Sequence, residues 1–263
     1  MTKMKGLAVV IAVSMLSTVS MADIWEPGLG VSVNFAPIHE IEGSSGNSMD
    51  GRSYGGALRY STPDPIPISA GISYQRGSSN HSGDPAYSSA SANSTVINAE
   101  LLAGKVFFPG NLEFVPYLGL GFRQMSQHFS SDSYPDDNDI ATPKRTHRHL
   151  YVPVGLYLGS AQPLDHFDFY LSAEYRRVVM GEVSLRKNGG GHMTSNEGNG
   201  VRTEMGVHFP SDLSFNMYAG VYYEWWDVYA PDRGVSVSAG LARAETEPRT
   251  KQTSAGVTLG LQF

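Results

Sequence analysis

From Asp23 onwards, apolar residues recur at every second position of the chain rather than at helical spacing. One example is the run Leu29, Val31, Val33 and Phe35, which is interrupted by small or polar residues. Successive side chains of a β-strand point to opposite faces, so this run predicts a strand with one apolar and one polar face. Ten segments have this pattern, within residues 29–35, 54–60, 68–75, 97–104, 117–123, 149–159, 169–176, 201–209, 215–225 and 256–263.

The connections between these segments alternate between short and long. The short ones contain proline or glycine and cover residues 61–65, 109–111, 161–165 and 210–212, whereas the long ones are polar and cover residues 37–51, 77–94, 127–146, 187–200 and 227–249. Short turns at one end and long loops at the other are typical of up-and-down outer-membrane barrels. The sequence therefore predicts an all-β fold, a single up-and-down antiparallel transmembrane β-barrel of ten strands, with eight or twelve as alternatives. An even number of strands places both termini at the end with the short turns.

The first 22 residues have the layout of a secretory signal peptide. Lys3 and Lys5 precede an apolar run over residues 6–16, and Ser20 and Ala22 occupy the −3 and −1 positions of a cut before Asp23. The apolar run is too short to span a bilayer as a helix, although an uncleaved anchor helix is the alternative. We expect residues 1–22 to be removed after Ala22 and residues 23–263 to form one barrel domain.

Composition narrows the class of protein further. Only 17% of the 263 residues are charged and 29 are glycine, while the mean hydropathy of −0.22 excludes a protein built from several membrane-spanning helices. Cysteine is absent from the sequence, which excludes a disulfide scaffold and a thiolate metal site. The net charge of −6 gives no reason to expect a nucleic-acid partner. We expect no cofactor.

Alternation also predicts which side chains face lipid and which face the lumen. The apolar face must contact lipid in a membrane barrel, although a soluble lipocalin-like barrel with its apolar face inside is the alternative. Side chains can fill the interior of a small barrel, and buried charges need partners, so we expect ion pairs in the lumen. Inward glycines leave room for large neighbours. The inward charges are Arg59, Glu100, Arg123, Glu174, Arg176, Arg202, Glu204 and Glu224.

Aromatic residues gather where the predicted strands end, as in the aromatic girdles of membrane barrels. The set near the short turns is Phe107, Phe114, Phe169, Phe209, Phe215 and Phe263, and the set near the long loops is Tyr54, Tyr74, Tyr175, Trp225 and Tyr229.

The last eight residues, Gly-Val-Thr-Leu-Gly-Leu-Gln-Phe, end on Phe263 after alternating apolar residues and an upstream glycine. They resemble the terminal strand signal of Gram-negative outer-membrane barrels. With the signal peptide, the chain resembles the small barrels of the OmpA-like and OmpX-like group, with an extra hairpin and without a periplasmic domain. This resemblance implies a place in the outer membrane, contact with lipid and lipopolysaccharide, and recognition of the strand ending at Phe263 by the barrel-assembly machinery.

Candidate chemistry is limited to the loop side of the predicted barrel. The omptin surface proteases also have ten strands and use Asp–Asp and Asp–His pairs at the outer rim. The nearest residues here are His147 and His149, which both face the lumen because they are two apart on a strand, and the loop residues Asp136, Asp137 and Asp139. Such a set could hold a metal ion or activate water. The omptin motifs are absent, however, and solvation explains the acidic loop, so we assign no catalytic, cofactor-binding or metal residues.

Three functions remain open at this point. The first is a non-enzymatic barrel with a side-chain-filled lumen and five loops for surface interaction or envelope integrity. The second is a narrow pore for small solutes, and the third is a rim-located surface hydrolase of omptin-like type. The loops favour an extracellular ligand, because the Tyr, Ser, Asn and Gly of the second and the Trp226, Asp227 and Tyr229 that open the fifth are typical of binding loops. Any flexible exposed loop has a similar composition. Arg177, Arg186 and Lys187 could meet lipopolysaccharide phosphates.

Overall fold

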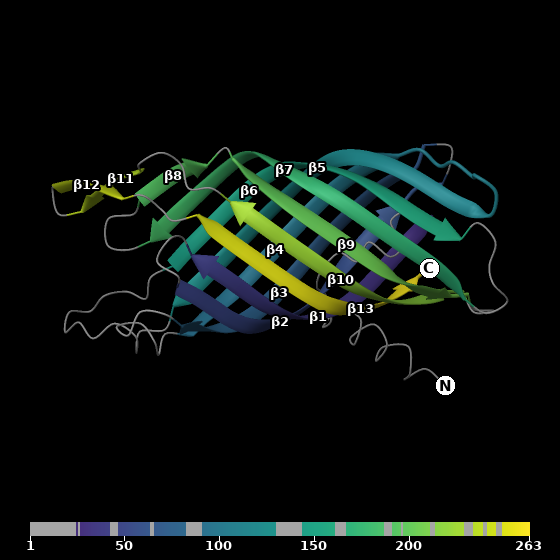
Figure 1. The fold of residues 1–263 in the computed structure, drawn as a ribbon, viewed down its shortest axis with the longest axis horizontal. Coiled ribbons are helices and arrows are strands. Elements are labelled where there is room, and N and C mark those ends of the chain that lie inside the picture. Colours follow the sequence, from purple (N-terminus) through teal and green to yellow (C-terminus); the bar gives the residue numbers. More distant parts are fainter. Residues whose placement is uncertain are drawn as a thin grey trace, which may run out of the picture.

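The structure is a computed structural model, and ten of its strands close into one antiparallel barrel (Figure 1). It describes residues 25, 27–42, 47–63, 66–82, 91–129, 144–160, 167–186, 191–195, 197–210, 214–228, 234–238, 241–245 and 249–263. The barrel strands are β1 (Gly28–Glu42), β2 (Asn47–Ser61), β3 (Ile68–Ser82), β4 (Ser91–Gly104), β5 (Leu112–Phe129), β6 (Lys144–Ser160), β7 (Asp168–Arg186), β9 (Gly198–Phe209), β10 (Asn216–Val228) and β13 (Thr250–Gln262). The prediction of an all-β, ten-stranded barrel is confirmed.

Three shorter strands lie outside the barrel wall. Strand β8 (Gly191–Ser195) pairs with β7 beyond the part of β7 that pairs with β9, while β11 (Gly234–Ser238) and β12 (Leu241–Glu245) pair with each other. All three belong to connections that the sequence predicted to be long loops.

Closure of the barrel occurs where its first strand pairs with its last. Strand β1 lies between β2 and β13, and Leu29 and Phe263 exchange two backbone hydrogen bonds of 3.0 and 3.1 Å. We call the end of the barrel at Gly28 and Phe263, with the short connections, the turn end, and the opposite end the loop end. The turn end lies on the right of Figure 1.

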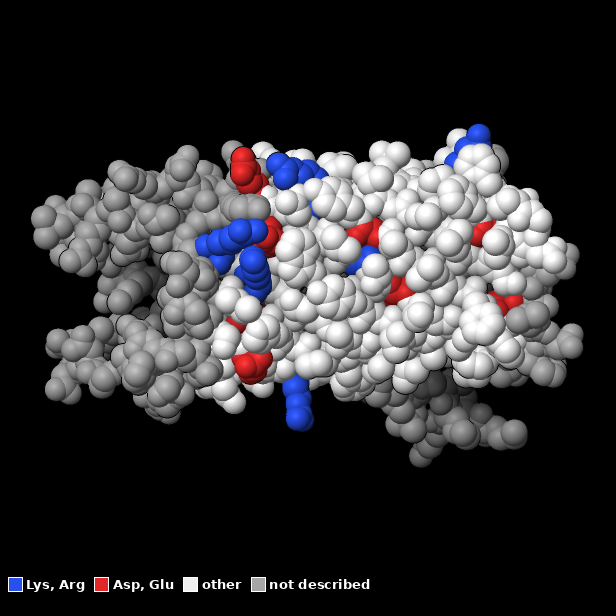
Figure 2. All heavy atoms as spheres, viewed as in Figure 1, with Lys and Arg blue, Asp and Glu red and all other residues white. Residues whose placement is uncertain are grey.

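The outer wall is apolar between two bands of aromatic rings. Large apolar side chains such as Leu118 (63% exposed) and Leu259 (53% exposed) point outwards, so the structure rules out a soluble barrel with an apolar interior. Figure 2 shows one such wall, where most Lys and Arg atoms gather near the loop end. Tyr229 lies outside the described residues, and Phe114, Phe215 and Trp225 are half-buried. The other predicted rim aromatics are exposed, namely Phe107, Phe169, Phe209, Phe263, Tyr54, Tyr74 and Tyr175.

At the loop end the strands run further than the sequence predicted. Residues 37–51 were predicted as a loop, but β1 continues to Glu42 and β2 begins at Asn47. The outward His39 and Asp50 lie there with Nδ1 and Oδ1 2.5 Å apart, so polar residues interrupt the apolar alternation while the backbone pairing continues. The same error placed Trp226 and Asp227 in a loop, whereas both are buried residues of β10, and Trp226 points into the lumen.

Inward glycines make room for inward aromatic rings, as predicted. A Cβ atom on Gly121 would lie 2.2 Å from the ring of Tyr151, and one on Gly155 would lie 2.3 Å from the ring of Tyr117. These contacts are far below van der Waals distance, so the rings occupy the space that the glycines leave. The core of the protein therefore lies within the lumen. The described residues contain no helix whose length and apolar character would let it cross a bilayer.

Candidate functional site: the charged lumen

All eight predicted inward charges are buried in the lumen, each no more than 6% exposed. We call this set, which comes from β2, β4, β5, β7, β9 and β10, the charge layer. Isolated buried charges are strongly unfavourable, so the arrangement of the partners decides whether the layer is stable. Its members are Arg59, Glu100, Arg123, Glu174, Arg176, Arg202, Glu204 and Glu224.

Arg176 lies at the centre of the charge layer and contacts three carboxylates. Its Nε donates to Glu174 on the same strand at 2.5 Å, and its Nη2 donates to Glu100 on β4 at 3.1 Å. Its Nη1 donates to Glu224 on β10. One guanidinium thus joins three strands through its planar fork of donors, the geometry in which arginine binds carboxylates best.

The remaining charges are paired as well. Arg59 donates to Glu100 at 3.3 Å, and Arg202 donates to Glu204 at 2.9 Å. The guanidinium of Arg123 lies 3.7 Å from Glu224. Four acids and four bases therefore form one set of ion pairs, as the sequence predicted.

Aromatic side chains complete the charge layer. The hydroxyl of Tyr151 donates to Glu100 at 2.7 Å, and the indole nitrogen of Trp226 donates to Glu224 at 3.0 Å. The guanidinium of Arg123 lies 4.9 Å from the centre of the Trp226 ring. Extra hydrogen bonds and cation–π contacts of this kind offset the desolvation of buried charges. Trp226 was not among the predicted lumen residues, although its alternation with Tyr222 and Glu224 places it on the inward face.

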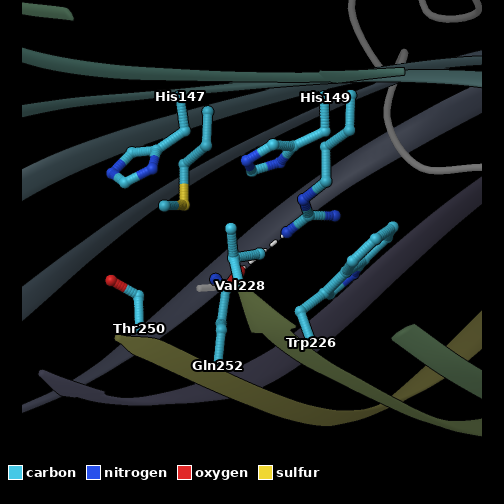
Figure 3. Close-up of a pocket in the computed structure, with 8 residues that line it drawn as sticks. His147, His149, Trp226, Val228, Thr250 and Gln252 are labelled. Carbon is cyan, nitrogen blue, oxygen red and sulfur yellow. Dashed lines mark hydrogen bonds between the residues drawn. The ribbon is translucent and has the colours of Figure 1, made fainter. Parts of the chain in front are cut away.

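A small cavity lies on the loop side of the charge layer (Figure 3). Its volume of about 20 Å³ is enough for a single water molecule. Arg123 reaches across it and donates to Gln252 at 2.8 Å. The residues that line the cavity are Arg123, Met125, His147, His149, Trp226, Val228, Thr250 and Gln252.

The two candidate histidines lie in this cavity. His147 and His149 are buried on β6 with ring centres 6.1 Å apart, and both point into the lumen, as predicted. The charged group that lines the cavity with them is Arg123, whose positive charge opposes binding of a metal cation.

The acidic part of the hydrolase hypothesis has no structural description. Asp136, Asp137 and Asp139 lie outside the described residues, as do Lys187 and the predicted cleavage site after Ala22. Within the described part of the chain, no group of three His, Cys, Asp or Glu residues is placed to hold a metal ion.

The structure also describes the surroundings of His208 and Arg177, two further residues considered in the sequence. The His208 ring stacks on Tyr170 with centres 4.9 Å apart, which agrees with a structural role. Arg177 is exposed on the outer wall and donates to Asn199 at 2.9 Å.

Comparison with known families identifies the barrel. The sequence model of the autotransporter β-domain family matches residues 20–221. The chain belongs to this family. No curated protein sequence matches the chain.

Among solved structures, the fold of this autotransporter-family barrel resembles that of the outer membrane protease OmpT from Escherichia coli. The two share 12% identity with a TM-score of 0.54, over 94% of this chain and 98% of OmpT. The translocator domain of the autotransporter NalP from Neisseria meningitidis shares 13% identity with a TM-score of 0.43, over 99% of this chain and 95% of that domain. The transport unit of the autotransporter AIDA-I from Escherichia coli shares 9% identity with a TM-score of 0.48, over 98% of this chain and 97% of that unit.

These findings establish an outer-membrane β-barrel. In such barrels the short turns face the periplasm and the longer loops face outwards, which orients the turn end and the loop end. The family found differs from the OmpA-like and OmpX-like group suggested by the C-terminal strand, and membership of that group is not confirmed. The likeness to OmpT concerns the fold alone, and at 12% identity it assigns no catalytic residue.

Proposed function

We propose that this autotransporter-family barrel is a non-enzymatic scaffold with a closed lumen, which presents its outer connections for surface interaction or envelope integrity. The observation that supports this proposal is the charge layer, in which Arg176 connects β4, β7 and β10. A scaffold of this kind needs a filled interior rather than a passage, and a network of buried ion pairs across the lumen supplies it.

The energetics of the charge layer argue against a route through the barrel. A solute or an exported polypeptide would have to separate Arg176 from Glu100 and Glu224, which are each no more than 6% exposed. Leaving one partner of a buried ion pair without its counter-charge costs about 3–5 kcal/mol. Several such pairs would have to break together, because they share carboxylates.

The loop end is the natural place for contact with other molecules. The connection over residues 130–143 carries Asp136, Asp137 and Asp139 together with Ser and Tyr residues, a composition that suits polar recognition. The exposed guanidinium of Arg177 on the outer wall supports contact with the phosphates of lipopolysaccharide. We therefore expect an extracellular ligand at the connections and anionic lipid at the wall.

Single-channel recording in planar bilayers tests whether the lumen is closed. We expect the wild-type protein to produce no conductance steps, and an Arg176→Ala/Glu224→Ala variant to produce them because a central pair of the charge layer is removed. The matched control is Arg148→Ala/Glu182→Ala, which removes an ion pair on the outer wall. Reproducible steps from the wild-type protein would overturn the closed-lumen proposal.

A separate experiment tests the absence of enzymatic activity. Intact cells that carry the wild-type barrel are compared with cells that carry His147→Ala/His149→Ala and with cells that lack the protein, using fluorogenic peptide and ester substrates. We expect equal hydrolysis in all three. Activity that depends on the protein and disappears in the double variant would support the surface-hydrolase alternative instead.

The contact role is tested by replacing residues 131–142 with a glycine–serine linker of equal length. We expect the barrel to fold and reach the outer membrane while adhesion of the cells to host-cell or extracellular-matrix surfaces, or resistance of the envelope to detergent, decreases. Unchanged adhesion and unchanged envelope resistance would contradict a function of this connection.

A further inference from the structure

An aromatic cluster fills the turn end of the lumen, on the opposite side of the charge layer from the cavity. It includes Trp25, which precedes β1 and is only 5% exposed. The cluster brings together side chains from five barrel strands, so it extends across the inner mouth of the barrel. The other buried members of the cluster are Leu102, Val115, Tyr117, Tyr157, Tyr170 and Tyr218.

The backbone at Gly28 directs Trp25 into the barrel. Gly28 has a φ of +125°, which is strained for residues with a side chain. A Cβ atom at this position would also lie 2.1 Å from the carbonyl oxygen of Phe263. Within three residues the chain thus passes from the barrel wall at Gly28 to the interior at Trp25, and glycine alone allows this path.

The wall around Trp25 is shaped to receive an indole ring. A Cβ atom on Gly104 would lie 2.8 Å from Cη2 and 3.0 Å from Cζ3 of Trp25, so the missing side chain of Gly104 forms part of the space that the ring occupies. The ring of Tyr117 lies against the indole with centres 5.4 Å apart and planes tilted by 51°. This tilted arrangement is one that aromatic pairs favour.

The contacts of Trp25 are made by its ring faces and edges. Its indole N–H group is buried and donates to no acceptor among the described residues. Withdrawal of the ring would therefore break packing contacts but no hydrogen bond of the indole, and water would then satisfy the N–H group.

We propose that Leu102, Gly104, Val115, Tyr117 and Tyr157 form a binding site for an indole ring, and that Trp25 is its tethered ligand. This inference is independent of the closed-scaffold proposal, because it concerns occupancy of the aromatic site and not conductance through the charge layer.

Chemical complementation tests the site directly. Trp25→Ala should leave an apolar cavity of indole size, and such cavities bind free aromatic molecules. In lipid vesicles, added indole should raise the unfolding temperature of Trp25→Ala in a saturable manner and leave that of the wild-type barrel unchanged. Trp225→Ala is the matched control, because it removes a rim tryptophan without opening the site and reports indole that partitions into the lipid. Equal responses of Trp25→Ala and Trp225→Ala would overturn the proposal.

A second measurement applies even where Trp25→Ala fails to fold. Trp25→Phe keeps an aromatic ring in the site, and the difference in fluorescence between the wild-type protein and this variant reports Trp25 alone. We expect the lost component to be blue-shifted and protected from acrylamide. A lost component with the emission and quenching of a water-exposed indole would show that Trp25 does not occupy the site.

Discussion

Arg176 and Glu224 form an ion pair between two strands that are not neighbours in the barrel wall. Strand β9 separates β7 from β10, and the two side chains meet inside the lumen, where each is less than 6% exposed. Glu224 also accepts a hydrogen bond from Trp226 and lies near Arg123, so one carboxylate is shared by three side chains. This sharing joins six of the eight charges, from Arg59 to Arg123, into one network rather than a set of separate pairs.

Removal of Glu224 should therefore destabilise the whole barrel. Glu224→Ala leaves Trp226 and Arg123 without their shared acceptor, and we expect the free energy of unfolding to fall by about 3–5 kcal/mol. Unfolding in urea, followed by the heat-dependent shift in gel mobility, measures the change. Glu182→Ala is the control, because its pair with Arg148 is exposed on the outer wall and should contribute less than about 1 kcal/mol. Similar losses in both variants would show that the charge layer is not a stabilising unit.

The loss of stability on substituting an inward glycine by alanine should depend on which side chain lies opposite it. Gly121→Ala places a methyl group 2.2 Å from the rigid ring of Tyr151, and we expect a loss of about 1–3 kcal/mol or failure to fold. Measured against Tyr151→Leu alone, the same Gly121→Ala change should cost less, because the ring it meets is gone. A Cβ atom on Gly71 would lie 3.3 Å from its nearest atoms, which belong to the long side chain of Arg59. Gly71→Ala should therefore change the stability much less than Gly121→Ala. A loss in Gly71→Ala as large as that in Gly121→Ala would contradict this packing scheme.

The sequence was sufficient to predict the barrel because alternation is a local signal. Within each strand, the alternation of apolar and polar residues shows which side chains face lipid. The inward positions of Arg59, Glu100 and Arg176 follow from this alternation. The same rule failed at the loop end, where polar residues such as His39 interrupt the outward apolar positions. Strand pairing there is a property of the backbone, and it carries β1 on to Glu42.

Partners across the lumen were not predictable in the same way. Alternation shows that Arg176 and Glu224 both face inwards, but their contact depends on barrel diameter, strand tilt and register, which set where residues 48 positions apart meet. The position of Trp25 was missed for a different reason. Trp25 precedes the first strand, so the alternation of the strands does not apply to it. The sequence features related to its position are Gly28, which allows the turn into the lumen, and Gly104, which leaves space for the ring.

The outer wall should distinguish lipid-facing from water-facing positions on a single strand. Leu259 and Thr253 both point outwards on β13, but Leu259 lies within the apolar belt whereas Thr253 pairs with the polar His39 near the loop end. In phospholipid bilayers, Leu259→Arg should reduce stability by about 2–4 kcal/mol and Thr253→Arg by about 0–1 kcal/mol. Equal effects at the two positions, measured by denaturant unfolding, would mean that the apolar belt does not face the bilayer centre.

Two substitutions on β6, one in the cavity and one in the charge layer beside it, should change the stability of the barrel differently. The Nε2 atom of His149 is buried and has no hydrogen-bond partner among the described residues, whereas the hydroxyl of Tyr151 donates to Glu100 at 2.7 Å. Replacing an unsatisfied buried polar group by an apolar one of similar size is neutral or stabilising, so His149→Leu should leave stability unchanged or raise it by about 1 kcal/mol. Tyr151→Phe should lower it by about 1–3 kcal/mol, because Glu100 loses a donor inside the lumen. Urea unfolding at pH 7 in the same bilayer measures both variants. A large loss in His149→Leu would show instead that the imidazole is held by a group in the cavity, and would reopen the question of chemistry at this end of the barrel.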